Sequence, residues 1–507
     1  MKNTVLKGSI ILIVSALLCK VLGAIYRIPL SNILGVEGVG VYQMIFSVFS
    51  VALIIASGGV SVTVSHQVAK IRASGEGSEK AVFIQGVLYS LIVSGVFALI
   101  FICFGKHIAT LQGNSLGGSG YLIAGLALVF ASIISAYRGL YQGRQNMLPT
   151  AISQMIEQIF KLVFGLLFAF LFIKKGIENG VLGAFLGITI SELLAFLFLL
   201  FTTKKTNFKV YSSVNSLGFW KTNIAVTVSG LVIPLVTALD SFLVVNILSR
   251  FYESGYATAL YGLQSGIVTS LINFPVVVSL AVSLALLPNL SFLKQKGEIN
   301  EVKKSLSNVY LALISVVFPC TIVFFVFSNE IFEILYPSIN SDLLVIASSL
   351  LRLSALEIVM IAILQVSTTA LQSLDKPKFV ASIMAICGIG KVALTIILVS
   401  MPSVNIYGLA VSALLFYFVS ALVMFLAVKK NVGFSIEKKP LVLCLTLTAL
   451  LALVFLLINV YFQSVWVKIV YALVSMVLVY VLPLYLSNFL NIKNFFINAY
   501  KRTRQIE

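Results

Sequence analysis

The sequence predicts an all-α polytopic membrane protein with about fourteen transmembrane helices. Hydrophobic residues make up 60% of the 507 residues and charged residues only 10%, with a mean hydropathy of +1.07. A soluble domain carries about 25% charged residues. Apolar runs long enough to cross a bilayer recur along the chain. They fall at roughly residues 5–30, 37–69, 80–105, 119–140, 149–173, 180–203, 221–248, 257–290, 304–327, 342–372, 378–400, 404–428, 440–461 and 466–489.

The distribution of lysine and arginine gives these helices an orientation. When the N-terminus is placed in the cytoplasm and the loops alternate, 25 of the 35 basic residues fall in inside segments, 6 in outside segments and 4 within the membrane. This bias predicts that both termini are cytoplasmic. It also accounts for the net charge of +18, which favours anionic membrane lipid. Nucleic acid is excluded as a partner because no clustered basic surface with interleaved aromatic residues is evident.

The loops divide the chain into two halves and a C-terminal extension. We expect an N-terminal six-helix bundle over residues 1–203, a cytoplasmic linker over 204–220 and a C-terminal six-helix bundle over 221–428. Residues 429–507 then hold the last two helices and a basic cytoplasmic tail. Two six-helix halves of the same orientation are parallel repeats, and such repeats occur in transporters that alternate access around a central site.

One stretch, residues 138–161, is the first candidate for a functional site. A basic, glycine-containing turn ends one apolar run, and Pro149 opens the next, as suits the first turn of a helix. Glu157 and Lys161 lie four residues apart, so they share one helical face. A weaker copy occurs at residues 370–377, with Lys391 fourteen residues after its proline, much as Lys161 follows Pro149 by twelve. The copy indicates that the two bundles are related.

Ionisable residues inside apolar runs are costly and usually mark a substrate or ion pathway. The basic ones are candidates to bind an anionic substrate: Lys20, Arg27, Arg138, Lys161, Arg352 and Lys391. The acidic ones are candidates for ion coupling or charge pairing: Glu157, Glu192, Asp240 and Glu357. Each can instead belong to a buried structural pair or, near a helix end, reach the membrane surface. Because the cations are at least as numerous as the carboxylates, an anionic substrate is favoured over a cationic drug.

No metal or cofactor is expected. The five cysteines stand singly in apolar runs without CxxC spacing. The chain has no GxxxxGK[ST] loop, so direct use of ATP is not expected. An enzyme acting on a membrane lipid would need catalytic carboxylates or metal ligands in a sizeable exposed loop. The predicted loops are too short for that, so we expect no enzymatic activity.

Several stretches resemble the polysaccharide-transport branch of the multidrug/oligosaccharidyl-lipid/polysaccharide (MOP) exporter superfamily, which includes lipid II flippases. They are the Lys20–Arg27 opening, the turn at residues 139–143, Pro149-Thr150, Glu157-Gln158 and the fourteen-helix layout. Phe160-Lys161 departs from the family pattern of an aliphatic residue followed by arginine. The charge is kept, but a bidentate donor is lost.

The resemblance implies a V-shaped pair of six-helix bundles around a cationic cavity in a bacterial plasma membrane protein. Its substrates would be undecaprenyl-diphosphate-linked sugars. Arginines near the start of the fold would bind the diphosphate, and Lys20 and Arg27 fall in that region. The last two helices would form a groove for the lipid tail.

These observations favour a flippase that moves a lipid-linked cell-wall precursor outward by alternating access. The alternative is an ion-coupled exporter of small molecules on the same fold, which would need an essential intramembrane carboxylate. A coupled Na⁺ or H⁺ ion and a cell-wall polymerase partner are both compatible with the sequence. Growth lipid II, a spore-cortex precursor and a capsular or teichoic precursor all fit as substrates.

Overall fold

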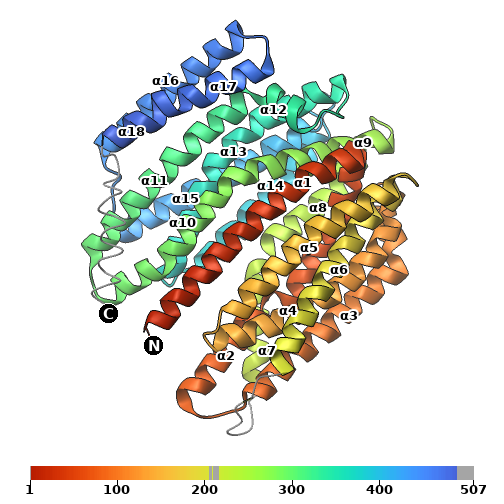
Figure 1. The fold of residues 1–507 in the computed structure, drawn as a ribbon, viewed down its shortest axis with the longest axis vertical. Coiled ribbons are helices and arrows are strands. Elements are labelled where there is room, and N and C mark those ends of the chain that lie inside the picture. The colour runs from red at the N-terminus through yellow and green to blue at the C-terminus, as the bar shows by residue number, and fades with distance from the viewer. Residues whose placement is uncertain (1, 205–207, 209–215, 488–507) are drawn as a thin grey trace. The chain divides into compact units, whose positions relative to one another are not determined.

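The computed structural model describes residues 2–204, 208 and 216–487, and every element assigned within them is helical. This confirms the predicted all-α class (Figure 1). Most of the predicted linker and the basic tail from residue 488 lie outside the described residues. The chain begins with α1 (Lys2–Leu53), η1 (Ile54–Gly58), α2 (Val60–Ser74), α3 (Glu79–Leu111), η2 (Ser115–Gly117), α4 (Gly118–Gly143), α5 (Leu148–Ile173), α6 (Ile177–Lys204), α7 (Ser216–Gly230), α8 (Val232–Leu248), α9 (Ser254–Tyr261) and η3 (Gly262–Val268). It continues with α10 (Thr269–Gln295), α11 (Ile299–Val326), α12 (Ser328–Leu335), α13 (Ser341–Ser373), α14 (Pro377–Val399), α15 (Tyr407–Val432), α16 (Lys438–Tyr461), α17 (Val465–Ser475), η4 (Met476–Val481) and α18 (Leu482–Leu486).

The protein is a multi-pass membrane protein. Among the described residues, 12 helical segments are long and apolar enough to cross a membrane, or 13 if the bent pair α7 and α8 forms one span. One segment, Val14–Ser74, has 61 residues, about three times the length of one crossing. Two helices are predicted within it, at residues 5–30 and 37–69, and Gly35 leaves the helical conformation (φ 68°, ψ 175°) between these two ranges. The count of fourteen spans stays a prediction.

The chain forms two compact units. The first comprises Met1–Ser270 with Gly388–Leu409, and the second comprises Leu271–Cys387 with Ala410–Glu507. The first unit extends past the predicted linker because α8, α9 and η3 pack against α1. The two units are defined by how compactly the chain packs, and they do not mark where a repeat begins or ends. The division into two six-helix repeats therefore stays a prediction.

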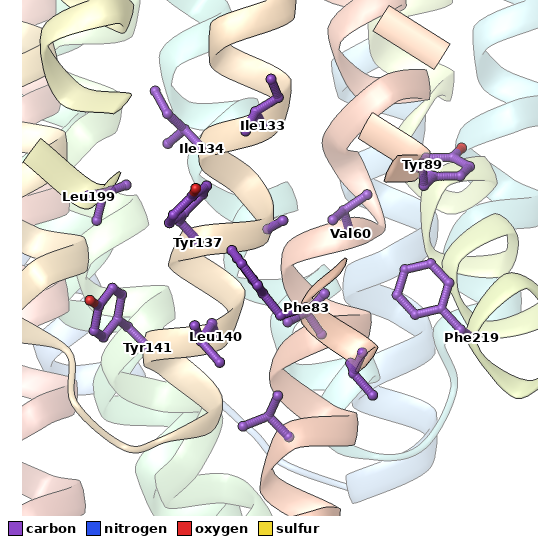
Figure 2. Close-up of a cluster of buried hydrophobic side chains, with 14 of the residues drawn as sticks. Val60, Phe83, Tyr89, Ile133, Ile134, Tyr137, Leu140, Tyr141, Leu199 and Phe219 are labelled. Atoms are coloured by element: carbon purple, nitrogen blue, oxygen red, sulfur yellow. The ribbon is translucent and has the colours of Figure 1, made fainter. Parts of the chain in front are cut away.

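Apolar residues spaced one helical turn apart form the core of the first unit. Val60, Val64 and Val68 form one stripe along α2, and they belong to the same buried cluster as Phe83 of α3 and Tyr137 of α4 (Figure 2). The Phe83 and Tyr137 rings meet edge to face at 4.8 Å between centroids. Side chains spaced three or four residues apart share one helical face. The three valines therefore form a buried stripe on the face of α2 that packs in this cluster.

Small residues allow α5 and α6 to cross closely. Gly183 and Gly187 of α6 lie four apart, and a methyl group added to Gly187 would overlap the backbone of Gly165 in α5. Small residues at this spacing let membrane helices approach through their backbones. In Figure 1, α5 and α6 run side by side with α4 next to α6. This packing brings polar residues of the three helices close together.

The two related turns have the same backbone geometry. Gln145 after α4 and Asp375 after α13 are both left-handed, with φ of 58° and 60°. In each turn, the amide of that residue donates to the carbonyl three residues back, and the next amide donates to the carbonyl five residues back, at 2.9–3.1 Å. This is the Schellman pattern that ends helices. Lys161 follows Gln145 by 16 residues, and Lys391 follows Asp375 by 16, which supports the proposal that the halves are related.

A buried ion pair joins α14 to α8 in the first unit. Lys391 Nζ donates to Asp240 Oδ2, and the two side chains are 7% and 8% exposed. About one turn away, Gly388 lies so close to α8 that an added methyl group would be 3.0 Å from Val236 Cγ2. The glycine therefore lets the two helices approach where the pair forms.

The second unit has a core that includes the C-terminal helices. Cys444, Leu451 and Phe455 of α16 are fully buried in a cluster that also contains Phe327 and Tyr480. The Tyr480 hydroxyl donates to the carbonyl of Ser315 in α11 at 2.8 Å. A buried hydroxyl needs such a partner, so this bond fixes η4 against α11.

We predict that Gly187→Ala lowers the unfolding temperature of the detergent-solubilised protein. The new methyl group would push α5 and α6 apart, and overpacking of this kind costs about 1–3 kcal/mol. Gly95→Ala is the matched control because nothing lies within 4 Å of a methyl group at Gly95. Equal unfolding temperatures for the two variants would contradict the close crossing.

We also predict that Lys391→Ala is less stable than the double variant Lys391→Ala, Asp240→Ala. Removal of the lysine alone leaves a buried carboxylate without its counter-charge, which costs about 3–5 kcal/mol. Unfolding temperatures in detergent measure the difference, and Lys175→Ala, at an exposed position, is the control. The structural role of the pair is wrong if the double variant is the least stable of the three.

Candidate functional site

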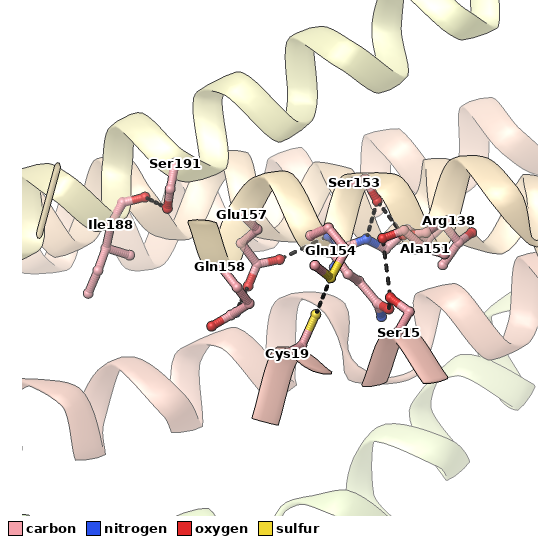
Figure 3. A network of polar contacts seen from close by, with 12 residues as sticks. Ser15, Cys19, Arg138, Ala151, Ser153, Gln154, Glu157, Gln158, Ile188 and Ser191 are labelled. Atoms are coloured by element: carbon pink, nitrogen blue, oxygen red, sulfur yellow. Dashed lines mark hydrogen bonds and ion pairs between the residues drawn. The ribbon is translucent and has the colours of Figure 1, made fainter. Parts of the chain in front are cut away.

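Arg138 of α4 is compensated by residues of α5 (Figure 3). Its Nε donates to Ser153 Oγ at 3.0 Å, and its Nη2 donates to Glu157 Oε2 at 2.9 Å. The second oxygen of Glu157 accepts from Gln158 Nε2 at 2.9 Å. Both charged side chains are 18% exposed. The structure thus brings together two of the predicted site residues, and the carboxylate offsets the charge of the arginine.

The first part of α1 also packs against α5. Ser15 Oγ donates to the carbonyl of Ala151 at 3.2 Å and to Gln154 Oε1 at 3.3 Å. One turn further, Cys19 Sγ lies 3.9 Å from Met155 Sδ (Figure 3). Lys20 follows with an exposed side chain. These contacts fix the register of α1 against α5.

Arg27 of α1 and Lys161 of α5 lie against one aromatic ring, that of Phe46. The Arg27 guanidinium carbon is 5.2 Å from the ring centroid, and Lys161 Nζ is 5.9 Å from it. The two cationic groups are therefore no more than about 11 Å apart, both within the range of cation–π attraction. We call Arg27, Lys161 and Phe46 the cation seat.

The remaining contacts of the cation seat are neutral. Arg27 Nη1 donates to Gln43 Oε1 at 3.0 Å, and its guanidinium carbon is 5.3 Å from the Tyr42 ring centroid. Lys161 Nζ lies 5.4 Å from the centroid of Tyr26. Within the described part of the chain, neither cation forms an ion pair with a carboxylate. The seat therefore carries two positive charges that have no carboxylate within ion-pair distance among the described residues.

Glu192 of α6 belongs to the same region. It is 8% exposed, and the charged groups that act on it are Glu157, Arg138 and Lys161. It makes no hydrogen bond or ion pair to another described residue. Arg138, Glu157, Lys161 and Glu192, which come from three helices, are therefore brought within electrostatic reach of one another.

The other predicted residues lie elsewhere. Lys391 and Asp240 form the buried pair between α14 and α8. Arg352 and Glu357 are both in α13 of the second unit, where Arg352 Nε donates to the buried Ser328 Oγ at 2.7 Å and Glu357 is buried. Eight of the ten candidates thus belong to the first unit, and the prediction that all ten line one cavity stays a prediction.

Sequence reasoning missed the neutral and aromatic partners of the cations. Tyr42 and Gln43 precede Phe46 on α1 by four and three residues, and that spacing could have placed them on the Phe46 face of the helix. It also missed the pair between Lys468 of α17 and Glu330 of α12, which are 2.5 Å apart. Lys468 is mostly buried and also donates to Asn459 Oδ1 at 2.7 Å.

Comparison with known proteins identifies the family. A family model described as "Polysaccharide biosynthesis protein" matches residues 5–294, and the MatE model matches residues 241–397. Stage V sporulation protein B of Bacillus subtilis (strain 168) is 25% identical over 355 residues, covering 66% of this chain and 68% of that protein. Lipid II flippase MurJ of the same organism is 24% identical over 483 residues, covering 89% of this chain and 88% of that protein.

Solved structures share the fold. A structure of lipid II flippase MurJ in an inward closed conformation has a TM-score of 0.69 at 15% identity, covering 96% of this chain and 98% of that one. An inward-facing multidrug resistance MATE transporter of the MOP superfamily has a TM-score of 0.68 at 14% identity, covering 82% and 94%. Because the first family model matches more than half of the chain, the protein belongs to the polysaccharide biosynthesis family and is a transporter or flippase of the MOP superfamily.

Proposed function

We propose that the protein is a flippase for an undecaprenyl-diphosphate-linked cell-wall precursor, with lipid II as the first candidate. The observation that carries this proposal is the cation seat, in which Arg27 and Lys161 share the Phe46 ring without a carboxylate partner. Arginine offers a forked donor to phosphate and lysine a mobile point charge. A diphosphate would supply the missing negative charge for both residues.

The pattern of charge pairing at Glu157 and Asp240 favours this function over the alternative. An ion-coupled exporter of cationic molecules needs a carboxylate available to its substrate or coupling ion. Glu157 is bonded to Arg138 and Asp240 to Lys391, so these two carboxylates are already neutralised. The uncompensated charge at the cation seat is positive, which favours an anionic substrate.

The relatives of this chain also support a lipid-linked substrate. Lipid II flippase MurJ aligns along most of the chain. We therefore infer the orientation predicted from the basic loops, with both termini in the cytoplasm and transport toward the outer leaflet. An inside-negative membrane potential favours outward movement of an anion by about 2.3 kcal/mol per charge per 100 mV. A cell-wall polymerase that consumes the delivered precursor is the expected partner.

The polyprenyl chain requires apolar surface. Val460, Trp466, Val470 and Leu473, at the end of α16 and along α17, are all more than half exposed. Lys468 holds α17 to α12 through Glu330. We assign the lipid tail to these helices, as the family resemblance implies.

We predict that the protein rescues cells depleted of their own lipid II flippase, scored by lipid II exposed in the outer leaflet. Arg27→Gln and Lys161→Gln should each lose rescue while membrane expression is kept. A hydrogen bond to a charged group contributes about 1.5–3 kcal/mol, so each substitution should weaken binding of undecaprenyl diphosphate about 10- to 100-fold.

Lys175→Gln is the matched control for this experiment, because it removes the same charge from an exposed position of the first unit. It should leave rescue and binding unchanged. If Arg27→Gln and Lys161→Gln both rescue as well as the unchanged protein, the cation seat does not hold the diphosphate. If the unchanged protein is well expressed but does not rescue, its substrate is not lipid II.

A further inference from the structure

Arg27 is held by a neutral side chain, whereas three other cations in the apolar helices are held by carboxylates. Arg27 Nη1 donates to Gln43 Oε1 at 3.0 Å, and Gln43 is 7% exposed. Arg138, Lys391 and Lys468 donate instead to glutamate or aspartate. A glutamate at position 43 would have nearly the same size and could accept the same hydrogen bond. The glutamine therefore holds Arg27 without cancelling its charge.

A break in α1 makes this contact possible. Arg27 and Gln43 are 16 residues apart, which would separate them by about 24 Å along a straight helix. Gly35 lies midway between them, and its backbone (φ 68°, ψ 175°) is in a region that favours glycine. A hydrogen bond across this span requires the chain to reverse at Gly35. The second part of α1 therefore faces the first part at Arg27.

The same reversal places two aromatic rings against Arg27. Its guanidinium carbon is 5.3 Å from the Tyr42 centroid and 5.2 Å from the Phe46 centroid. Cation–π attraction and one hydrogen bond thus hold the guanidinium group on this side. Its Nε and Nη2 groups form no hydrogen bond to any residue that the structure describes. These two groups share one edge of the guanidinium plane, and such an edge donates two parallel hydrogen bonds to phosphate.

We propose that Gln43 is a positioning residue that makes the cation seat selective for an anion. This inference rests on the proposed function. By holding Nη1, Gln43 leaves the Nε–Nη2 edge of Arg27 for a phosphate group. Because the amide is neutral, the whole positive charge of Arg27 attracts the ligand. A carboxylate at the same position would keep the hydrogen bond but neutralise the arginine.

The contacts of Arg27 also reduce the entropic cost of binding. A free arginine side chain loses conformational freedom when it becomes fixed by a ligand, and that loss weakens binding. Gln43 and the two rings fix the Arg27 guanidinium group before a ligand arrives. The loss of freedom is therefore met during folding instead of during binding.

The experiment measures the dissociation constant of undecaprenyl diphosphate for the full chain in nanodiscs, together with the unfolding temperature of each variant. Gln43→Glu keeps the acceptor and the side-chain length but adds a negative charge beside Arg27. We expect binding to weaken about 100-fold, because an adjacent opposite charge cancels much of the attraction for the anion. The unfolding temperature should not fall. Gln463→Glu adds the same charge at an exposed position of the second unit and should bind like the unchanged protein.

A second variant tests whether Gln43 acts through Arg27. Gln43→Met is similar in size but offers Arg27 no oxygen acceptor. We expect it to weaken binding about tenfold in the unchanged protein and to cause no further loss when combined with Arg27→Gln, because coupled residues are not additive. The comparison of the two single variants with the double variant measures this coupling.

Tight binding by Gln43→Glu, equal to that of the unchanged protein, overturns the inference. Loss of binding together with a lower unfolding temperature in Gln43→Glu also overturns it, since the residue would then be structural. An equal effect of Gln43→Met with and without Arg27 does so as well. Failure of the proposed function has a different signature, in which Arg27→Gln and Lys161→Gln bind undecaprenyl diphosphate as tightly as the unchanged protein.

Discussion

A charge in the apolar interior of this protein needs a counter-charge, and the structure depends on how that requirement is met. Lys391 and Asp240 join α14 to α8, Arg138 and Glu157 join α4 to α5, and Lys468 joins α17 to Glu330 of α12. Two of these pairs join helices that are distant in sequence, with 151 residues between Asp240 and Lys391 and 138 between Glu330 and Lys468, whereas Arg138 and Glu157 join the consecutive helices α4 and α5. The pairs also neutralise charges that would otherwise compete for a ligand, whereas Arg27 and Lys161 of the cation seat have no ion pair among the described residues.

The lysines that follow the two related turns differ in whether they form an ion pair. Lys161 and Lys391 occupy the same position after equivalent left-handed residues, yet their surroundings differ. Lys391 is held by a carboxylate and contributes to helix packing. Lys161 lies over the rings of Tyr26 and Phe46 instead. If the halves arose from one repeat, Lys391 has a structural role, while Lys161 is the lysine that we propose binds the substrate.

Composition and charge patterning were enough to predict the fold class, because a bilayer imposes long apolar helices on any chain that crosses it. Pro149 correctly marked the start of α5. Hydropathy also revealed which residues are charged inside apolar runs, but not their partners. Lys391 and Asp240 are 151 residues apart, and only the packed structure brings them together. The aromatic side of the cation seat was missed because an apolar ring in an apolar helix gives no signal in a hydropathy pattern.

We propose that Arg27 and Lys161 hold the diphosphate while the buried ion pairs stay intact. The most direct measurement is an electron cryo-microscopy structure of the protein with an undecaprenyl-diphosphate-linked sugar in nanodiscs. We expect phosphate oxygens within about 3.5 Å of the Arg27 guanidinium and the Lys161 ammonium groups, with the Arg138–Glu157 and Lys391–Asp240 pairs unchanged. Phosphate density at Arg138 or Lys391, with those pairs broken and the cation seat empty, would contradict it.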